Sequence, residues 1–152
     1  MVLFLLVLAV GCTTSDLAPE TQITVTRVID GDTIEVDIGG TIYRIRYIGM
    51  DTPELDDERP EFCALAQEAT RLNRQLVEGE TVRLEQDISE TDKYGRLLRY
   101  VYVDDTFVNA ELVRRGLAWA EAYEPDTKYQ DILEEAEAEA RQDKIGIWQE
   151  SY

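Results

Sequence analysis

The sequence predicts an α+β domain of five short strands and three helices. Three apolar runs with the two-residue alternation of β-strands follow one another between residues 23 and 48. A stretch with helical spacing then precedes two further strands, and two more helical stretches come after them. The chain has 152 residues, of which 44% are apolar, and this is enough for one domain with a buried core.

The first three strands form a meander over residues 23–29, 33–37 and 41–48. Asp30-Gly31-Asp32 marks the turn after the first strand, and Gly39-Gly40 can supply the positive φ angles of a tight hairpin after the second. The alternation of the third strand places its arginines on one face and its tyrosines on the other: Arg44 and Arg46 against Tyr43, Ile45 and Tyr47.

The first helix and the last two strands follow from changes in the apolar spacing. An acidic loop broken by Pro60 comes before the helix, and Gly79 is suited to end it. The helix covers residues 64–77, and its apolar stripe consists of Leu65, Ala69, Leu72 and Leu76. Residues 81–85 and 96–103 read as the fourth and fifth strands.

Two helices complete the pattern. Asn109 can cap a short helix that Gly116 ends, and Thr127 with Gln130 fits the capping box of a last helix. Its inward stripe consists of Ile132, Leu133, Ala136 and Ala140, and the residues expected to return to the core after it are Ile145, Ile147 and Trp148. A meander of strands followed by a long connection is compatible with a small closed barrel of the OB type.

The charge and the absence of histidine limit the possible chemistry. The net charge is -17, with 32 acidic and 15 basic residues, so the surface repels polyanions at long range. An ordinary solvated acidic surface and adaptation to high salt both fit this composition. With no histidine, Ser-His-Asp triads, Cys-His pairs and His-ligated zinc are excluded. Any chemistry must use carboxylates, arginine, lysine, tyrosine or a bound metal.

The N-terminal segment has the pattern of an export signal. Residues 2–10 are an unbroken apolar run that is too short to span a bilayer, and Cys12 follows a small residue as in a lipobox. We expect residues 1–11 to be a lipoprotein-type signal peptide, residues 12–21 a tether, and Cys12 the lipidated residue. The chain is then exported, either held at the membrane only through that lipid or secreted. This leaves Cys63 alone, and no histidine is present to activate it as a nucleophile.

Acidic residues gather at the ends of the first strands. Asp32 begins the second strand and Asp51 follows the third, so a meander can bring the two carboxylates together. Two carboxylates without histidine or thiolate suit Ca²⁺ or Mg²⁺, and the backbone carbonyl near Thr52 could add an oxygen ligand. Taken alone, however, Asp30-Gly31-Asp32 is usually only a turn.

Two arginines and a third acid lie near this cluster. Arg46 and Arg96 can each grip a phosphate with two donors, and Glu54 can orient or deprotonate a water molecule. Together the groups could carry out metal-assisted hydrolysis of a phosphodiester. Each arginine alone could equally be paired with a surface acid.

Several spaced blocks, in order, resemble the staphylococcal nuclease (thermonuclease) family. They are residues 29–33, Arg46 with residues 49–54, residues 91–97, Val108-Asn109 with residues 112–118, and residues 136–148. The resemblance implies an OB-fold barrel with three helices over residues 22–150. It also implies Ca²⁺-dependent cleavage of DNA and RNA, single-stranded or loosened, leaving 3′-phosphate ends.

The resemblance also implies roles for single residues. Asp32, Asp51 and the carbonyl of Thr52 would bind Ca²⁺. Arg46 and Arg96 would hold the scissile phosphate, with Glu54 as general base. The residues expected to line the nucleotide pocket are Lys93, Tyr94 and Tyr123.

The chain departs from the family in two ways. A second family tyrosine, two positions before Tyr123, has no counterpart, and the best-known members are basic rather than acidic. We expect weak substrate affinity that rises with Ca²⁺, and a monomer. The alternative functions are a non-catalytic OB-fold module that binds nucleic acid or protein, and a purely structural domain.

Overall fold

The computed structural model describes residues 23–149. The expected signal peptide (1–11), the tether (12–21) and Cys12 lie outside these residues, so export and lipidation stay predictions. Within the described part, no helix is both long and apolar enough to cross a membrane.

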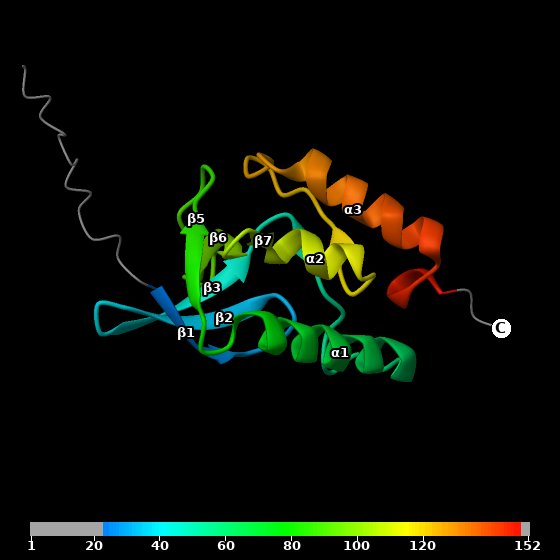
Figure 1. Ribbon diagram of the computed structural model, residues 1–152, viewed down its shortest axis with the longest axis horizontal. Coiled ribbons are helices and arrows are strands. Elements are labelled where there is room, and N and C mark those ends of the chain that lie inside the picture. The colour runs from blue at the N-terminus through cyan, green and yellow to red at the C-terminus, as the bar shows by residue number, and fades with distance from the viewer. Residues whose placement is uncertain (1–22, 150–152) are drawn as a thin grey trace, which may run out of the picture.

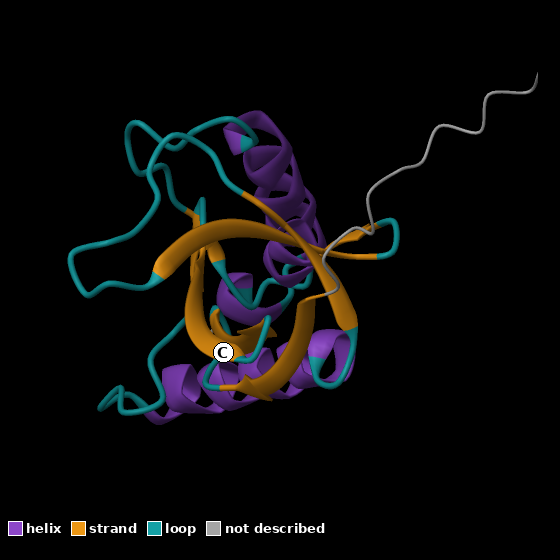
Figure 2. Cartoon of the chain, turned by 90° about the vertical axis from the view of Figure 1, so that its left-hand side faces the viewer, coloured by secondary structure: helices purple, strands orange, loops and turns teal. Residues whose placement is uncertain are grey.

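Five strands close into a barrel, as the sequence predicts. They are β1 (Ile23–Val28), β2 (Thr33–Ile38), β3 (Thr41–Tyr47), β5 (Thr81–Glu85) and β6 (Leu97–Val103). Antiparallel pairs run in the order β3-β2-β1-β5-β6, and a parallel pairing of β3 with β6 joins the two ends. Figure 2 shows the strands curving into this ring. The architecture is the OB-type α+β barrel with three helices.

Three two-residue strands were not predicted. β4 (Met50–Asp51) pairs with β8 (Trp119–Ala120), and β7 (Thr106–Phe107) pairs with the end of β6. Two residues are too few to show alternation in a sequence. The β4–β8 pair matters for the site because it sets the backbone at Asp51 opposite Trp119.

The helices are α1 (Pro60–Val77), α2 (Val108–Arg114) and α3 (Gln130–Asp143), followed by a 3₁₀ turn at Gly146–Trp148. In Figure 1, α1 runs below the barrel and α3 above it, with α2 packed against both α3 and β6. The expected start of α1 at residue 64 was wrong. Pro60 occupies the first turn of the helix, where its missing N–H is not needed, so it begins the helix rather than breaking it. Gly79 and Gly116 follow their helices with positive φ, as expected.

Both predicted helix caps were wrong. Asn109 lies inside α2 and is fully buried. Its Oδ1 accepts a hydrogen bond from the N–H of Val101, and its Nδ2 donates one to the carbonyl of Ile48. Tyr129 is the residue before α3, and no side chain caps that helix. Asn109 therefore ties α2 to β6 and to the end of β3, instead of capping a helix.

The core fills the barrel and the space under the helices. Its largest fully buried side chains include Tyr47, Ile34, Ile45, Met50 and Leu133. Two expectations about the last segment were wrong. Ile132 is 43% exposed, and Ile145, Ile147 and Trp148 are only half-buried. The stripe of α3 that packs inward consists of Leu133, Ala136 and Ala140.

We predict that Asn109→Ala destabilises the fold by about 3 kcal/mol. The substitution suits a helix but leaves a buried N–H of β6 and a buried carbonyl at Ile48 without partners. Urea unfolding measures the free energy. Glu135→Ala, an exposed position on α3, is the control and should change stability by less than about 0.5 kcal/mol. Equal stability of the two variants would contradict the role of Asn109.

Candidate active site

The register of β2 and β3 brings the first acid next to an arginine. Thr33 pairs with Arg46 across these strands, and the N–H of Tyr47 donates to the carbonyl of Asp32 at 3.0 Å. Asp32 therefore lies beside the C-terminal end of β3. The chain then turns through Gly49 into β4, which carries Asp51.

Arg46 bridges the two expected metal-binding acids. Its Nη1 lies 3.1 Å from Asp32 Oδ2, and its Nη2 lies 2.5 Å from Asp51 Oδ1. Nη1 also donates to the carbonyls of Tyr47 and Met50. The Arg46 side chain is only 13% exposed, so this is not the surface ion pair that the arginine alone would suggest. Asp32 and Asp51 therefore converge on one cationic group.

Thr52 holds Asp32 in place. Its N–H and its hydroxyl both donate to Asp32 Oδ2, at 3.1 and 2.9 Å, and Thr33 Oγ1 donates to Oδ1. Gly31 makes this approach possible, since a Cβ there would lie 2.7 Å from a side-chain atom of Thr52. The glycine of the Asp-Gly-Asp turn is thus needed for close packing around the acid.

Two acids in this region have pKa values far above the ordinary range. Burial raises the pKa of Asp51 to about 6; attraction to Arg46 opposes the shift and repulsion by Asp32 adds to it. Burial and repulsion by Asp32 likewise raise the pKa of Asp30 to about 6. Burial is the main cause of both shifts, and repulsion between neighbouring acids adds to it. Across residues 23–149, no group of three or more acidic or cysteine side chains forms a ready metal site.

Arg96 is held by a turn that Asp92 organises. Asp92 Oδ1 accepts from the backbone N–H groups of Tyr94 and Arg96, and its Oδ2 lies 2.7 Å from Arg96 Nε. Although burial alone would raise the pKa of Asp92, these hydrogen bonds lower it. Asp92 was not singled out from the sequence. The sequence held a signal for this turn, since an aspartate side chain often accepts hydrogen bonds from backbone N–H groups a few residues further along the chain.

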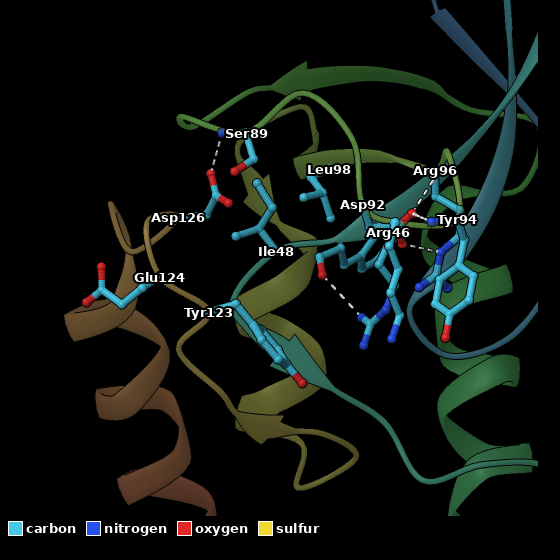
Figure 3. Close-up of a pocket in the computed structure, with 13 residues that line it drawn as sticks. Arg46, Ile48, Ser89, Asp92, Tyr94, Arg96, Leu98, Tyr123, Glu124 and Asp126 are labelled. Carbon is cyan, nitrogen blue, oxygen red and sulfur yellow. Dashed lines mark hydrogen bonds and ion pairs between the residues drawn. The ribbon is translucent and has the colours of Figure 1, made fainter.

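A pocket of about 490 Å³ opens beside the two arginines. The predicted nucleotide residues Lys93, Tyr94 and Tyr123 all line it, together with Arg46 and Arg96. In the view of Figure 3, the Tyr123 ring lies on one side of Arg46 and the Tyr94 ring on the other. Tyr94 is 72% exposed, so its ring is open to a ligand.

The wall of this pocket also carries Asp126, which the sequence analysis did not single out. Its Oδ1 accepts from the N–H groups of Ile88 and Ser89 and so fixes the loop above the pocket. Burial, followed by a hydrogen bond to the Glu121 carboxylate, raises the pKa of Tyr123 to about 12. The Tyr123 hydroxyl therefore stays protonated at neutral pH.

Glu54 lies on the other side of Arg96. It is exposed, and it lines a second pocket together with Arg96, Arg44 and Tyr43. Its charge adds to the repulsion that raises the pKa of Asp51, so the two acids are electrostatic neighbours. Asp32 and Asp51 thus contact Arg46, whereas Glu54 shares the second pocket with Arg96.

Tyr43 shares one face of β3 with Ile45 and Tyr47, as the alternation predicts. It is nevertheless 40% exposed, because the β2–β3 hairpin extends past the barrel. The sequence analysis did not identify the pocket that Tyr43 and Arg44 line. A signal was present in the sequence, since both residues precede Arg46 on the same strand.

Comparison with known proteins agrees with the fold. Residues 44–150 match the family described as staphylococcal nuclease homologue. The chain is 40% identical over 125 residues to a thermonuclease of Staphylococcus intermedius, which covers 82% of this chain and 74% of that protein. It is 44% identical over 134 residues to the endonuclease YncB of Bacillus subtilis, covering 86% of this chain and 63% of that protein.

A third relative is much longer than this chain. The SPbeta prophage-derived endonuclease YokF of Bacillus subtilis is 42% identical over 131 residues, or 84% of this chain but 44% of YokF. The chain therefore spans less than half of that protein. The family match covers more than half of the chain, and the thermonuclease match extends over most of both proteins. With the closed OB-type barrel, these matches show that the chain belongs to the family of staphylococcal nuclease homologues.

Proposed function

We propose that this protein is a Ca²⁺-dependent phosphodiesterase that hydrolyses DNA and RNA to products with 3′-phosphate ends. The observation that carries the proposal is the convergence of Asp32 and Asp51 on Arg46, at the edge of a pocket that Arg96 also lines. Membership in a nuclease family, with relatives named thermonuclease and endonuclease, supports hydrolysis of nucleic acid.

The arginines are suited to hold the scissile phosphate. Arg46 and Arg96 line the same pocket, and a guanidinium can give two parallel hydrogen bonds to phosphate oxygens. Because Nη1 and Nη2 of Arg46 contact Asp32 and Asp51, Arg46 must exchange these contacts for the phosphate when the acids hold a cation. Asp92 holds Arg96 through Nε, which orients the guanidinium toward the pocket. The positive charge of the two side chains stabilises the charge that builds on the phosphate oxygens in the transition state.

A hard cation fits the acids. Asp32 and Asp51 already converge on one positive group, and the raised pKa of Asp51 shows that further positive charge would be favourable. Asp32, Asp51 and the carbonyl of Thr52 would hold Ca²⁺, which prefers oxygen ligands. When bound, the ion supplies positive charge close to the phosphate.

Glu54 is suited to take a proton from the attacking water. Its exposed carboxylate lines the second pocket beside Arg96, so a water molecule there has access to it. The water oxygen forms a bond to phosphorus while its proton passes to Glu54. The bond between phosphorus and the 5′ oxygen breaks, and that oxygen leaves and takes up a proton. The phosphate stays on the 3′ oxygen.

The substrate must be single-stranded or locally open. The first pocket has the exposed rings of Tyr94 and Tyr123, and a base can stack on such rings only when it is not paired in a duplex. At a net charge of -17 the protein cannot rely on broad electrostatic attraction to a polyanion. The attraction is local, from Arg46, Arg96, Lys93 and bound Ca²⁺, so affinity rises with Ca²⁺.

We predict that Arg96→Ala lowers kcat on single-stranded DNA at least 100-fold, because one of the two charge-stabilising donors is lost. Single-turnover cleavage with Ca²⁺ measures the rate, and thermal unfolding checks the fold. Arg71→Ala is the matched control, since Arg71 is a surface arginine of α1 that pairs with Glu68. If the wild-type protein binds single-stranded DNA but does not cleave it, the alternative function, a non-catalytic OB-fold binding module, is correct instead.

We predict that Ca²⁺ raises the melting temperature of the protein, since a ligand that binds only the folded state stabilises it. The shift should shrink as pH falls through about 6, because protons then compete for Asp51. Asp51→Asn should abolish the shift, and Asp105→Asn, in an exposed turn, should keep it. Cleavage that persists unchanged in a chelator would show that the metal is not needed.

Without Ca²⁺, we predict that Asp51→Asn makes the protein more stable at pH 7.5. The folded-state pKa of about 6 lies above the ordinary 3.8, so ionisation of Asp51 lowers stability as the pH rises from about 4 to about 6, and the full cost is present at pH 7.5. An asparagine keeps an acceptor for Arg46 without that charge. The gain should be about 1 kcal/mol, after discounting for partial exposure, and should vanish near pH 4. Urea unfolding at both pH values tests it, and a gain of equal size at pH 4 would contradict the electrostatic cause.

A further inference from the structure

We propose that the second pocket binds the next nucleoside of the substrate strand, on the other side of the scissile phosphate, and that its base stacks on Tyr43. This inference rests on the proposed function, and it adds Tyr43 as a binding residue. The pocket has a volume of about 610 Å³, comparable with the first, and Tyr43, Arg44, Glu54, Tyr94 and Arg96 line it.

The two pockets meet at Arg96, which is proposed to hold the scissile phosphate. Tyr94 and Arg96 line both of them, whereas Tyr123 lines only the first and Tyr43 only the second. A phosphate held by Arg96 therefore has a hollow on each side. Every internal phosphate of a polynucleotide has a nucleoside on each side, so one strand can fill both pockets while its phosphate lies at the arginine.

Barrel closure creates this arrangement. β3 and β6 pair in parallel, with Ile45 opposite Leu97. The residues just before them, Arg44 and Arg96, are therefore neighbours although 52 positions separate them in the chain. Ile42 and Tyr43, from the β2–β3 hairpin, form one wall of the second pocket, and the turn at Tyr94 and Gly95 forms the other.

The wall has groups suited to a nucleoside. Tyr43 is 40% exposed, and in the described part of the chain its ring stacks on no other ring. An exposed tyrosine ring is a sequence-tolerant platform for a base. Ile42, 52% exposed and lining the same pocket, extends the apolar surface.

The charge beside Tyr43 favours a strand with phosphates. Glu35 is shared by two arginines: Arg27 contacts it through Nε and Nη2, and Arg44 through Nε. The three side chains together carry a charge of +1, so Arg44 keeps attraction for a phosphate despite its acidic partner. A strand held on both sides of the cut needs no free end, which makes internal cleavage the favoured mode.

The test uses a dithymidine joined by one phosphodiester and two analogues, each with a hydrogen in place of one base. In the presence of Ca²⁺, Tyr43→Ala should lower kcat/KM on the dinucleotide about tenfold. On the analogue that lacks the base stacked on Tyr43, this loss of kcat/KM should disappear. On the analogue that lacks the other base, the loss should persist. Tyr123→Ala should show the reverse pattern, because Tyr123 lines the first pocket only.

Two further variants separate stacking from a general disturbance. Tyr43→Phe keeps the ring and should retain most of the wild-type kcat/KM. Ile132→Ala removes an equally exposed apolar side chain on α3 and should change nothing. The inference is overturned if Tyr43→Ala leaves kcat/KM on the dinucleotide unchanged, or lowers it equally on both analogues.

The proposed function can fail separately. If the wild-type protein cleaves none of the three compounds nor longer single strands, hydrolysis is wrong. The affinities of the same compounds, measured by titration calorimetry with Ca²⁺, then take the place of kcat/KM. The same pattern across the Tyr43 and Tyr123 variants supports the second pocket, and equal affinities overturn it.

Discussion

Arg46 keeps two carboxylates together that would otherwise repel each other. Asp32 lies just before β2 and Asp51 lies in β4, and the guanidinium contacts both. The rest of the site supports this contact: Thr52 fixes Asp32, and the pairing of β4 with β8 fixes the backbone of Asp51. A single half-buried cation thus organises the acids around which both pockets open.

The cluster is built at a cost to stability. Burial and mutual repulsion raise the pKa values of Asp30 and Asp51, so their charged forms are held in the fold against a penalty. Such a penalty is typical of sites that bind a positive ligand, because the ligand removes it. The acidic surface of the whole chain repels a polyanion, so any attraction of a polyanion must come from the positive groups of the site.

The closure of the barrel connects this cluster to a path for the substrate. Arg46 and the preceding residues of β3 lie along β6 because the two strands pair in parallel. The turn organised by Asp92 leads into β6 and places Arg96 where the two pockets meet. The acid cluster and both pockets therefore depend on the same pairing of β-strands that are far apart in the chain.

The sequence by itself determined the local features. Alternating side chains predicted the five strands, glycines predicted the turns, and the acids and arginines in spaced blocks predicted a family and its site. Only the tertiary structure decided which partners distant residues have. Asn109 joins α2 to β6 instead of capping a helix, and Tyr43 is exposed and lines a pocket. Periodicity shows which side chains share a face of one element, but contacts between elements depend on packing and on the register of the closed sheet.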